Sequence, residues 1–283
     1  MELLGMKIDS HQHFWKYNQV DYVWMNEQHA IIQKDFLPEH LNPLLNSLDF
    51  DGTISVQARQ SLEETDFLLQ LAEDNSFIKG VVGWVPFCDK KVEKYIEIYK
   101  SENKIVGFRH VIHDEPDNNF ILRPDFNEGI KSLNKFGLCY DILIFAHHLP
   151  QTIKFVDSHP RQTFVLDHIA KPKINKNSFD VDWANHMKKI SEREHVYCKL
   201  SGIVTEILQE SWDIELLKPY FETILDAFGP ERMVFGSDWP VCLIKSTYTN
   251  WVNAVLSLIN TLSANEQIAI MGGNAERIYL QTH

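Results

Sequence analysis

The chain has 283 residues, of which 44% are hydrophobic and 23% are charged, and its formal net charge is −12 at pH 7. These proportions are ordinary for a globular protein with a substantial core, and they exclude a disordered chain. The acidic balance argues against a nucleic-acid partner, which would need a basic surface. The length suits one α/β barrel of about 250 residues or two ordinary domains.

Cysteine usage and the N-terminal segment bear on the cellular compartment. The four cysteines are widely spaced and include no C-x-x-C pair, so no disulfide framework is expected. Met1–Lys7 lacks a basic stretch followed by an apolar one, and no apolar run approaches the roughly 18 residues of a membrane span. We therefore expect a soluble cytoplasmic protein with no membrane partner. The sequence does not indicate an oligomeric state.

Short apolar segments rich in β-branched residues are predicted to be strands. Several are apolar at successive positions, which is typical of parallel strands covered on their outer face. In chain order they are Met6–Ser10, Gly52–Gln57, Lys79–Val85, Ile105–His110, Leu138–Ile144, Thr163–Asp167, Val196–Leu200 and Arg232–Gly236.

Longer amphipathic segments between the strands are predicted to be helices. They are Pro38–Leu48, Leu62–Asn75, Lys90–Ser101, Asp125–Lys135, Leu149–Ser158, Val181–Ser191, Ile214–Phe228 and Thr247–Leu262. A last helix is expected after Ser263, because Ser263 and Glu266 form a capping-box pattern. The alternation predicts one (β/α)8 TIM barrel over residues 1–283. An open doubly wound sheet is the alternative, but no glycine-rich phosphate loop follows the first strand.

The segment Phe14–Lys34 does not fit this alternation. It is long and aromatic, and it follows the first strand, so in a barrel it would lie on the catalytic face. Long loops in compact domains are usually binding lids or disordered, and the aromatic residues disfavour disorder. The segment is therefore interpreted as a lid over the barrel mouth.

His11 and His13 end the first predicted strand. Side chains two residues apart on a strand point to the same side, so the two imidazoles can converge on a metal or a substrate oxygen. The alternative is a pair of surface histidines, because an H-x-H pattern by itself is a weak signal.

Two further strand ends carry acid–base groups. Asp238 follows the eighth strand, where barrel active sites gather, and the closed barrel makes the first and eighth strands neighbours. His168 follows the sixth strand and could supply a third imidazole to the same mouth. The alternatives are an aspartate that satisfies a local turn and a histidine in a loop.

Short motifs follow one another from residue 6 to about residue 240, one near each predicted strand end. They are DSHQHFW (9–15), VQA (56–58), GWVP (83–86), GFR (107–109), YD (140–141), HLP (148–150), VLDH (165–168), KLSG (199–202) and VFGSDWP (234–240). The set resembles the lactonase branch of the amidohydrolase superfamily, which includes L-fucono- and L-rhamnonolactonases and muconolactone hydrolases. The resemblance implies a (β/α)8 fold and hydrolysis of a sugar or organic-acid lactone.

The resemblance also implies a set of site residues. His11, His13, His168 and Asp238 match the metal-centre positions of the superfamily. The fifth strand departs from the pattern, because it carries Tyr140-Asp141 and has no bridging lysine or histidine, which argues against a two-metal site. We therefore expect at most one divalent ion, zinc, with catalysis that needs no metal as the alternative.

The mechanism expected from these residues is hydrolysis of a lactone ester, with Asp238 as the general base that takes a proton from water. The electrophile is either a metal or a protonated imidazole of His11, His13 or His168.

Other residues at strand ends are candidates for substrate binding. Arg109 and Lys199 could hold a substrate oxygen, although an ion pair with Asp141 or Asp167 is the alternative for both. The remaining candidates are Gln57, Trp84 and Trp239, the two indoles as an apolar wall against the sugar ring.

The resulting hypothesis is a lactonase of carbohydrate catabolism that acts on a small sugar lactone, L-fuconolactone first and L-rhamnonolactone or a related deoxy-sugar lactone next. A zinc-dependent decarboxylase of the same superfamily and a non-catalytic sugar-binding barrel are the alternatives.

Overall fold

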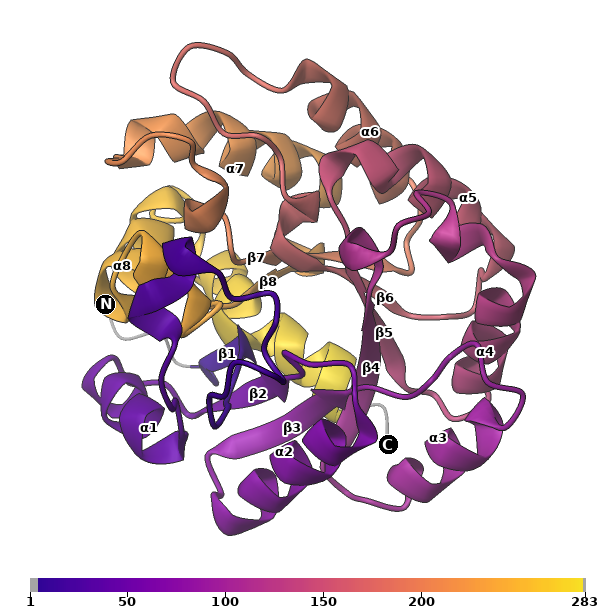
Figure 1. The fold of residues 1–283 in the computed structure, drawn as a ribbon. Coiled ribbons are helices and arrows are strands. Elements are labelled where there is room, and N and C mark those ends of the chain that lie inside the picture. The colour runs from indigo at the N-terminus through magenta and orange to yellow at the C-terminus, as the bar shows by residue number, and fades with distance from the viewer. Residues whose placement is uncertain (1–4, 282–283) are drawn as a thin grey trace.

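The computed structural model describes residues 5–281, and its strands form one eight-stranded parallel sheet in the order β1 to β8 (Figure 1). Part of the N-terminal segment in which no signal peptide is expected, residues 1–4, lies outside the described residues. The strands are β1 (Ile8–Gln12), β2 (Gly52–Val56), β3 (Ile78–Gly83), β4 (Ile105–Val111), β5 (Cys139–Leu143), β6 (Phe164–Leu166), β7 (Val196–Leu200) and β8 (Met233–Phe235).

Helices surround the sheet and cover its outer face (Figure 1). They are α1 (Pro38–Ser47), α2 (Leu62–Asp74), α3 (Val92–Lys100), α4 (Pro124–Asn134), α5 (Leu149–Ser158), α6 (Val181–Ser191), α7 (Ile214–Phe228), α8 (Tyr248–Leu258) and α9 (Ala264–Ile268). The predicted (β/α)8 architecture is confirmed. The prediction of one domain over residues 1–283 stays a proposal, supported by the membership of every strand in one sheet.

Hydrogen bonds between the two ends of the sheet close the barrel. The backbone N–H of His13 donates to the carbonyl of Trp239, and the N–H of Asp238 donates to the carbonyl of His11, both at 2.7 Å. The Ser10 hydroxyl donates to the carbonyl of Phe235 in β8. Closure thus places the residues that follow β1 and β8 side by side.

The segment that follows α9 packs against the strands of the barrel. After α9, whose capping box between Ser263 and Glu266 is present as predicted, two π-helical turns run from Ala269 to Gly273 and from Glu276 to Leu280. Tyr279 belongs to the apolar cluster formed by the strands, and its hydroxyl donates to Asp141 at 2.8 Å. The sequence pattern predicts the helix after Ser263. It does not predict that the turns after this helix pack against the strands.

The long loop after β1 is ordered by its own contacts. Trp15 and Phe36 exchange two backbone hydrogen bonds at its base, and the Trp15 indole donates to the carbonyl of Lys34. Tyr22 donates to the buried carboxylate of Glu64 at the start of α2. The two ends of the loop are therefore joined to each other, and its middle is held against α2.

Within residues 5–281, no helix is both long enough and apolar enough to cross a membrane.

Acidification is expected to destabilise the fold partly through His159, which follows α5. Its Nε2–H donates to the Asn127 side chain at 2.8 Å, and its ring packs on Phe155 and Phe164. Burial, reinforced by the Lys131 charge, lowers the pKa of His159 to about 4. Between that value and about 6.5 the unfolded chain binds more protons than the folded one, so this contribution to stability is lost as the pH falls through that window.

Urea unfolding of the wild type and of His159→Gln between pH 4 and pH 7 measures this effect. The free energy of unfolding of the variant is expected to fall less steeply with decreasing pH. The difference in slope should correspond to at most one proton taken up on unfolding. Equal slopes for the two proteins would show that His159 does not contribute.

Candidate active site

Barrel closure assembles the predicted acid–base residues at one mouth. His11 lies in β1, and Asp238 lies three residues beyond the end of β8. The close approach of the two strands requires glycine at position 236, because a Cβ there would come within 2.6 Å of the His11 Cβ. Packing therefore explains the glycine of the Gly-Ser-Asp stretch, whereas chemistry explains its aspartate.

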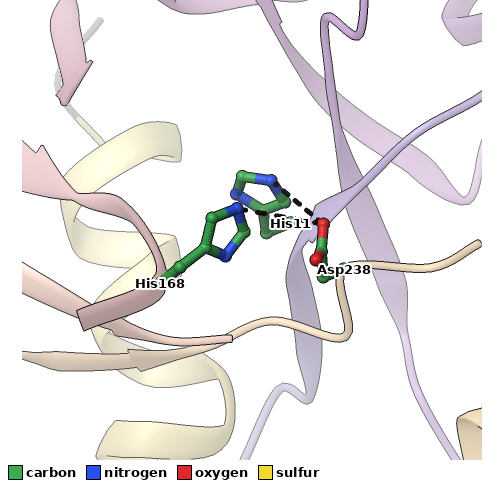
Figure 2. A group of neighbouring side chains, drawn as sticks. All are labelled: His11, His168 and Asp238. Carbon is green, nitrogen blue, oxygen red and sulfur yellow. Dashed lines mark ion pairs between the residues drawn. The ribbon is translucent and has the colours of Figure 1, made fainter. Parts of the chain in front are cut away.

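Three imidazoles face one carboxylate oxygen of Asp238. The Nε2 atoms of His13, His11 and His168 lie 3.3, 3.8 and 3.9 Å from its Oδ1. Figure 2 shows the rings of His11 and His168 turned toward the Asp238 carboxylate from separate strand ends. All four side chains are nearly inaccessible, with at most 4% of each residue exposed. The structure thus brings together the four residues that the sequence indicates.

Hydrogen bonds hold two of the rings in place. His13 donates through Nδ1–H to the carbonyl of Val56 at 2.7 Å, which leaves Nε2 directed at Asp238. His168 Nδ1 is 2.9 Å from the Ser201 hydroxyl. Such contacts fix which nitrogen is available to a ligand or a proton.

His168 begins an unusual backbone segment after β6. Four successive residues, His168 to Lys171, have left-handed φ angles of 53°, 48°, 61° and 49°. Left-handed conformations cost non-glycine residues roughly 1–2 kcal/mol each, so the surrounding contacts must stabilise the turn. The turn brings both His168 and Lys171 to the barrel mouth.

Gly202→Ala is expected to displace the His168 ring. Gly202 has φ +60°, and a Cβ there would come within 2.3 Å of His168 Nδ1. Misplacement of a reacting group by about 1 Å can lower a rate by about 10²-fold, so we expect a fall in kcat/KM approaching that size.

The matched control for this change is Gly229→Ala. Gly229 has a similar φ of +67°, but a Cβ there would meet no atom within 4 Å. Thermal unfolding should show similar strain in both variants, whereas steady-state kinetics should show the loss only in Gly202→Ala. A similar activity loss in both would mean that strain, and not the clash with His168, is the cause.

The electrostatics of the site keep the imidazoles of His11 and His168 neutral and the Asp238 carboxylate ionised. Burial lowers the pKa of His11 and of His168 well below the usual value. Burial by itself raises the pKa of Asp238, but the neighbouring His168 and His13 bring it below the usual value. Asp238 is therefore an anion at neutral pH, the form that accepts a proton or binds a cation.

A second charged layer lies beneath the mouth. Arg109 Nη1 pairs with Asp167 at 2.9 Å, and Lys199 Nζ pairs with Asp141 at 2.5 Å and with Asp167 at 3.0 Å. Although burial opposes ionisation, Lys199 and His11 hold the pKa of Asp167 well below its usual value. The ion pairs that the sequence leaves open for Arg109 and Lys199 are thus present.

Lys199 occupies the position that a second cation would need. The atoms of His11, Asp141 and Asp167 lie within 4.8 Å of one another and could hold a metal by distance alone. The Lys199 ammonium sits against all three, including a 3.2 Å contact with His11 Nδ1. This arrangement supports the expectation of no more than one metal.

The mouth opens into a cavity of about 970 Å³. His13, His168 and Asp238 line it together with Arg109. The cavity also meets residues that the sequence reasoning did not select: Trp24, His29, His113, Phe145, Lys171 and Glu206. Trp24 and His29 come from the loop after β1, so that loop forms part of the wall, as the lid interpretation anticipates.

The other predicted substrate-binding residues lie outside the cavity lining. Gln57 and Lys199 are fully buried, and Gln57 donates to the carbonyl of Arg109. Trp84 donates its indole N–H to His110, and Trp239, 2% exposed, packs edge-on against Phe36. In the structure these four side chains are held by contacts with other protein groups and do not line the cavity.

Comparison with known proteins agrees with this architecture. Residues 8–280 match the model of the amidohydrolase family. The chain belongs to the amidohydrolase family. The resemblance stated from the motifs is therefore confirmed.

Two curated relatives are named for one activity. The L-fucono-1,5-lactonase of Burkholderia multivorans is 38% identical over 97% of this chain and 96% of its own length. The L-fucono-1,5-lactonase of Burkholderia ambifaria is 32% identical over 98% of this chain and 96% of its own length. A crystal structure of a Burkholderia multivorans amidohydrolase with bound zinc has a TM-score of 0.93 and 37% identity, covering 97% of this chain and 99% of that one.

The residues at the mouth fit a single zinc ion. Ligand atoms of His11, His168 and Asp238 lie within 4.8 Å of one another, whereas His13 contacts Asp238 but is not part of this group of three. Two neutral imidazoles and an ionised carboxylate are the protonation states that zinc requires. The expectation of one divalent ion at most is consistent with this donor set.

Proposed function

We propose that this protein hydrolyses L-fucono-1,5-lactone, or a closely related deoxy-sugar lactone, to the corresponding aldonate. The observation that carries the proposal is an ionised Asp238, held among three imidazoles at the floor of a cavity large enough for a sugar lactone. The two curated lactonases, similar over nearly the whole chain, support the choice of substrate class.

Asp238 acts as the general base in the proposed reaction. It takes one proton from a water molecule, and the water oxygen bonds to the lactone carbonyl carbon. The ring C–O bond then breaks, the ring oxygen takes up a proton to become a hydroxyl, and the acid product ionises. His13 and His168, which line the cavity beside Asp238, orient the carboxylate and the water.

The metal site proposed for this chain consists of His11, His168 and Asp238. A zinc ion bound there would polarise the lactone carbonyl or lower the pKa of water. His11 is held from below by contacts of its Nδ1 with Asp167 and Lys199, so its Nε2 stays directed at the mouth. The same contacts keep the group assembled for catalysis without a metal.

A lactone panel tests the proposed function. The purified protein is incubated with L-fucono-1,5-lactone, L-rhamnonolactone and stereoisomers of each, and acid release is followed with a pH indicator. We expect the fastest hydrolysis with L-fucono-1,5-lactone. No acid release across the panel would contradict the proposal, and carbon dioxide release from an aromatic or unsaturated acid would favour the decarboxylase alternative.

Zinc content and activity, measured before and after treatment with a chelator, test separately whether the reaction needs a metal. Full activity in a sample free of zinc would show that the three ligands act as a hydrogen-bonding site. We also propose the cytoplasmic location that the sequence indicates, which fractionation of the native host would test.

A further inference from the structure

Few of the positive charges near the cavity are available to a substrate. The Arg109 guanidinium donates hydrogen bonds to Asp167 and to the carbonyl of Gln57. Lys199 is fully buried between Asp141 and Asp167. The imidazoles of His11 and His168 are neutral, because burial lowers their pKa values. Arg109 and Lys199, the two cations predicted to contact the substrate, are therefore engaged in ion pairs with Asp167 and Asp141.

Lys171 differs from these residues in its position. It lines the cavity, and 15% of its side chain is exposed. Its Nζ is 2.6 Å from Oε1 of Glu206, whose side chain lines the same cavity and is 18% exposed. An ammonium group has three donors, so the pair with Glu206 orients Lys171 and leaves donors for a ligand.

The backbone also directs Lys171 to the reactive centre. It ends the left-handed turn that begins at His168, so the turn that aims His168 at Asp238 also brings Lys171 to the mouth. Its charge reaches the reacting carboxylate: together with His168 and His13, Lys171 offsets the effect of burial on the pKa of Asp238. The ammonium is thus part of the electrostatic surroundings of Asp238.

We propose that Lys171, oriented by Glu206, is the substrate-contacting cation of this cavity and binds the carboxylate that ring opening creates. The proposal rests on the proposed function, since a neutral lactone becomes an anion only through its hydrolysis. Before ring opening the ammonium faces a neutral ligand, and afterwards it faces a full negative charge. Lys171 therefore contributes more to binding of the aldonate than to binding of the lactone.

Binding of the aldonate measures this role directly. The aldonate is made by alkaline hydrolysis of L-fucono-1,5-lactone, and its dissociation constant is measured by calorimetry with the wild type and with Lys171→Met. Loss of a charge-assisted hydrogen bond should weaken binding by about tenfold to a hundredfold. The KM for the lactone should rise less than the inhibition constant of the aldonate, and Lys171→Arg should restore most of the affinity.

Lys245→Met is the matched control. Lys245 lines the same cavity and its ammonium donates to the carbonyl of Gln209, but, unlike Lys171, Lys245 is not among the charges with the largest effect on the pKa of Asp238. This variant should bind the aldonate within about twofold of the wild type. Because position 171 has a left-handed backbone, Lys171→Asn replaces the methionine variant if the latter does not fold, since asparagine tolerates that conformation.

Two results would overturn the proposal: aldonate binding by the Lys171 variants within twofold of the wild type, or an equal loss in Lys245→Met. Failure of the proposed function is a different result, because it appears as a wild type that hydrolyses no lactone in the panel. Calorimetry with the aldonate needs no turnover, so it measures the role of Lys171 separately from hydrolysis, and a wild type that does not bind the aldonate would also overturn the proposal.

Discussion

Asp238→Asn is expected to lower kcat by about 10²–10⁴-fold while the fold is retained. The amide has nearly the same shape as the carboxylate but cannot accept a proton from water. Three imidazole nitrogens within 3.9 Å face Oδ1 of Asp238, so the change removes the group on which the site converges. Steady-state kinetics with the preferred lactone measure the effect, and circular dichroism checks the fold.

The control for this variant is Asp114→Asn. Asp114 lines the same cavity and contacts His113 at 3.3 Å, but its side chain is 59% exposed and contacts none of the three imidazoles. We expect less than a tenfold change in kcat from this substitution. Near-wild-type turnover by Asp238→Asn would remove Asp238 from the role of base, and zinc analysis of the variant would show whether metal binding had changed with it.

Lys199→Met is expected to destabilise the protein by about 3–5 kcal/mol, because it leaves buried carboxylates without their cation. Lys199, Asp141 and Asp167 all have no exposed side-chain surface. Burial already raises the pKa of Asp141 to about 6 despite the nearby Lys199 charge. Without that charge the protonated carboxyl is favoured further, so the loss of stability should be larger at pH 8 than at pH 5.

The double variant Lys199→Met/Asp141→Asn separates loss of charge balance from loss of packing. It removes one positive and one negative charge together, and we expect it to recover part of the stability lost in the single variant. Urea unfolding at both pH values measures all three proteins. If the single variant is as stable as the wild type at pH 8, the ion pairs of Lys199 do not support the barrel.

The fold could be predicted from the sequence because its signals are local. Helices α5, α6 and α7 have the predicted boundaries, since amphipathic spacing and caps are properties of consecutive residues. The predicted helix from Thr247 starts at Tyr248, because the Thr247 hydroxyl caps it by accepting from the N–H of Asn250. Such errors of one or a few residues do not change the architecture.

The candidate site could be predicted in part. His11, His13, His168 and Asp238 stand at ends of apolar strands, and parallel strands in a closed barrel bring those ends to one mouth. Lys171 could have been noticed three residues after His168, but no local pattern distinguishes it from a lysine on the surface. Its place in the cavity depends on the left-handed turn, which non-glycine residues rarely adopt.

The sequence by itself determined the alternation of strands and helices, the barrel, and the four acid–base residues at its mouth. These features follow from the spacing of apolar residues and from the polar residues at strand ends, which are properties of consecutive residues. Only the tertiary structure decided which cations are held in buried ion pairs. Arg109 and Lys199 occupy strand positions like those of the acid–base residues, yet they are engaged with Asp167, and Lys199 also with Asp141. A charge inside a barrel pairs with whichever opposite charge other strands bring near, and that depends on contacts between residues far apart in sequence.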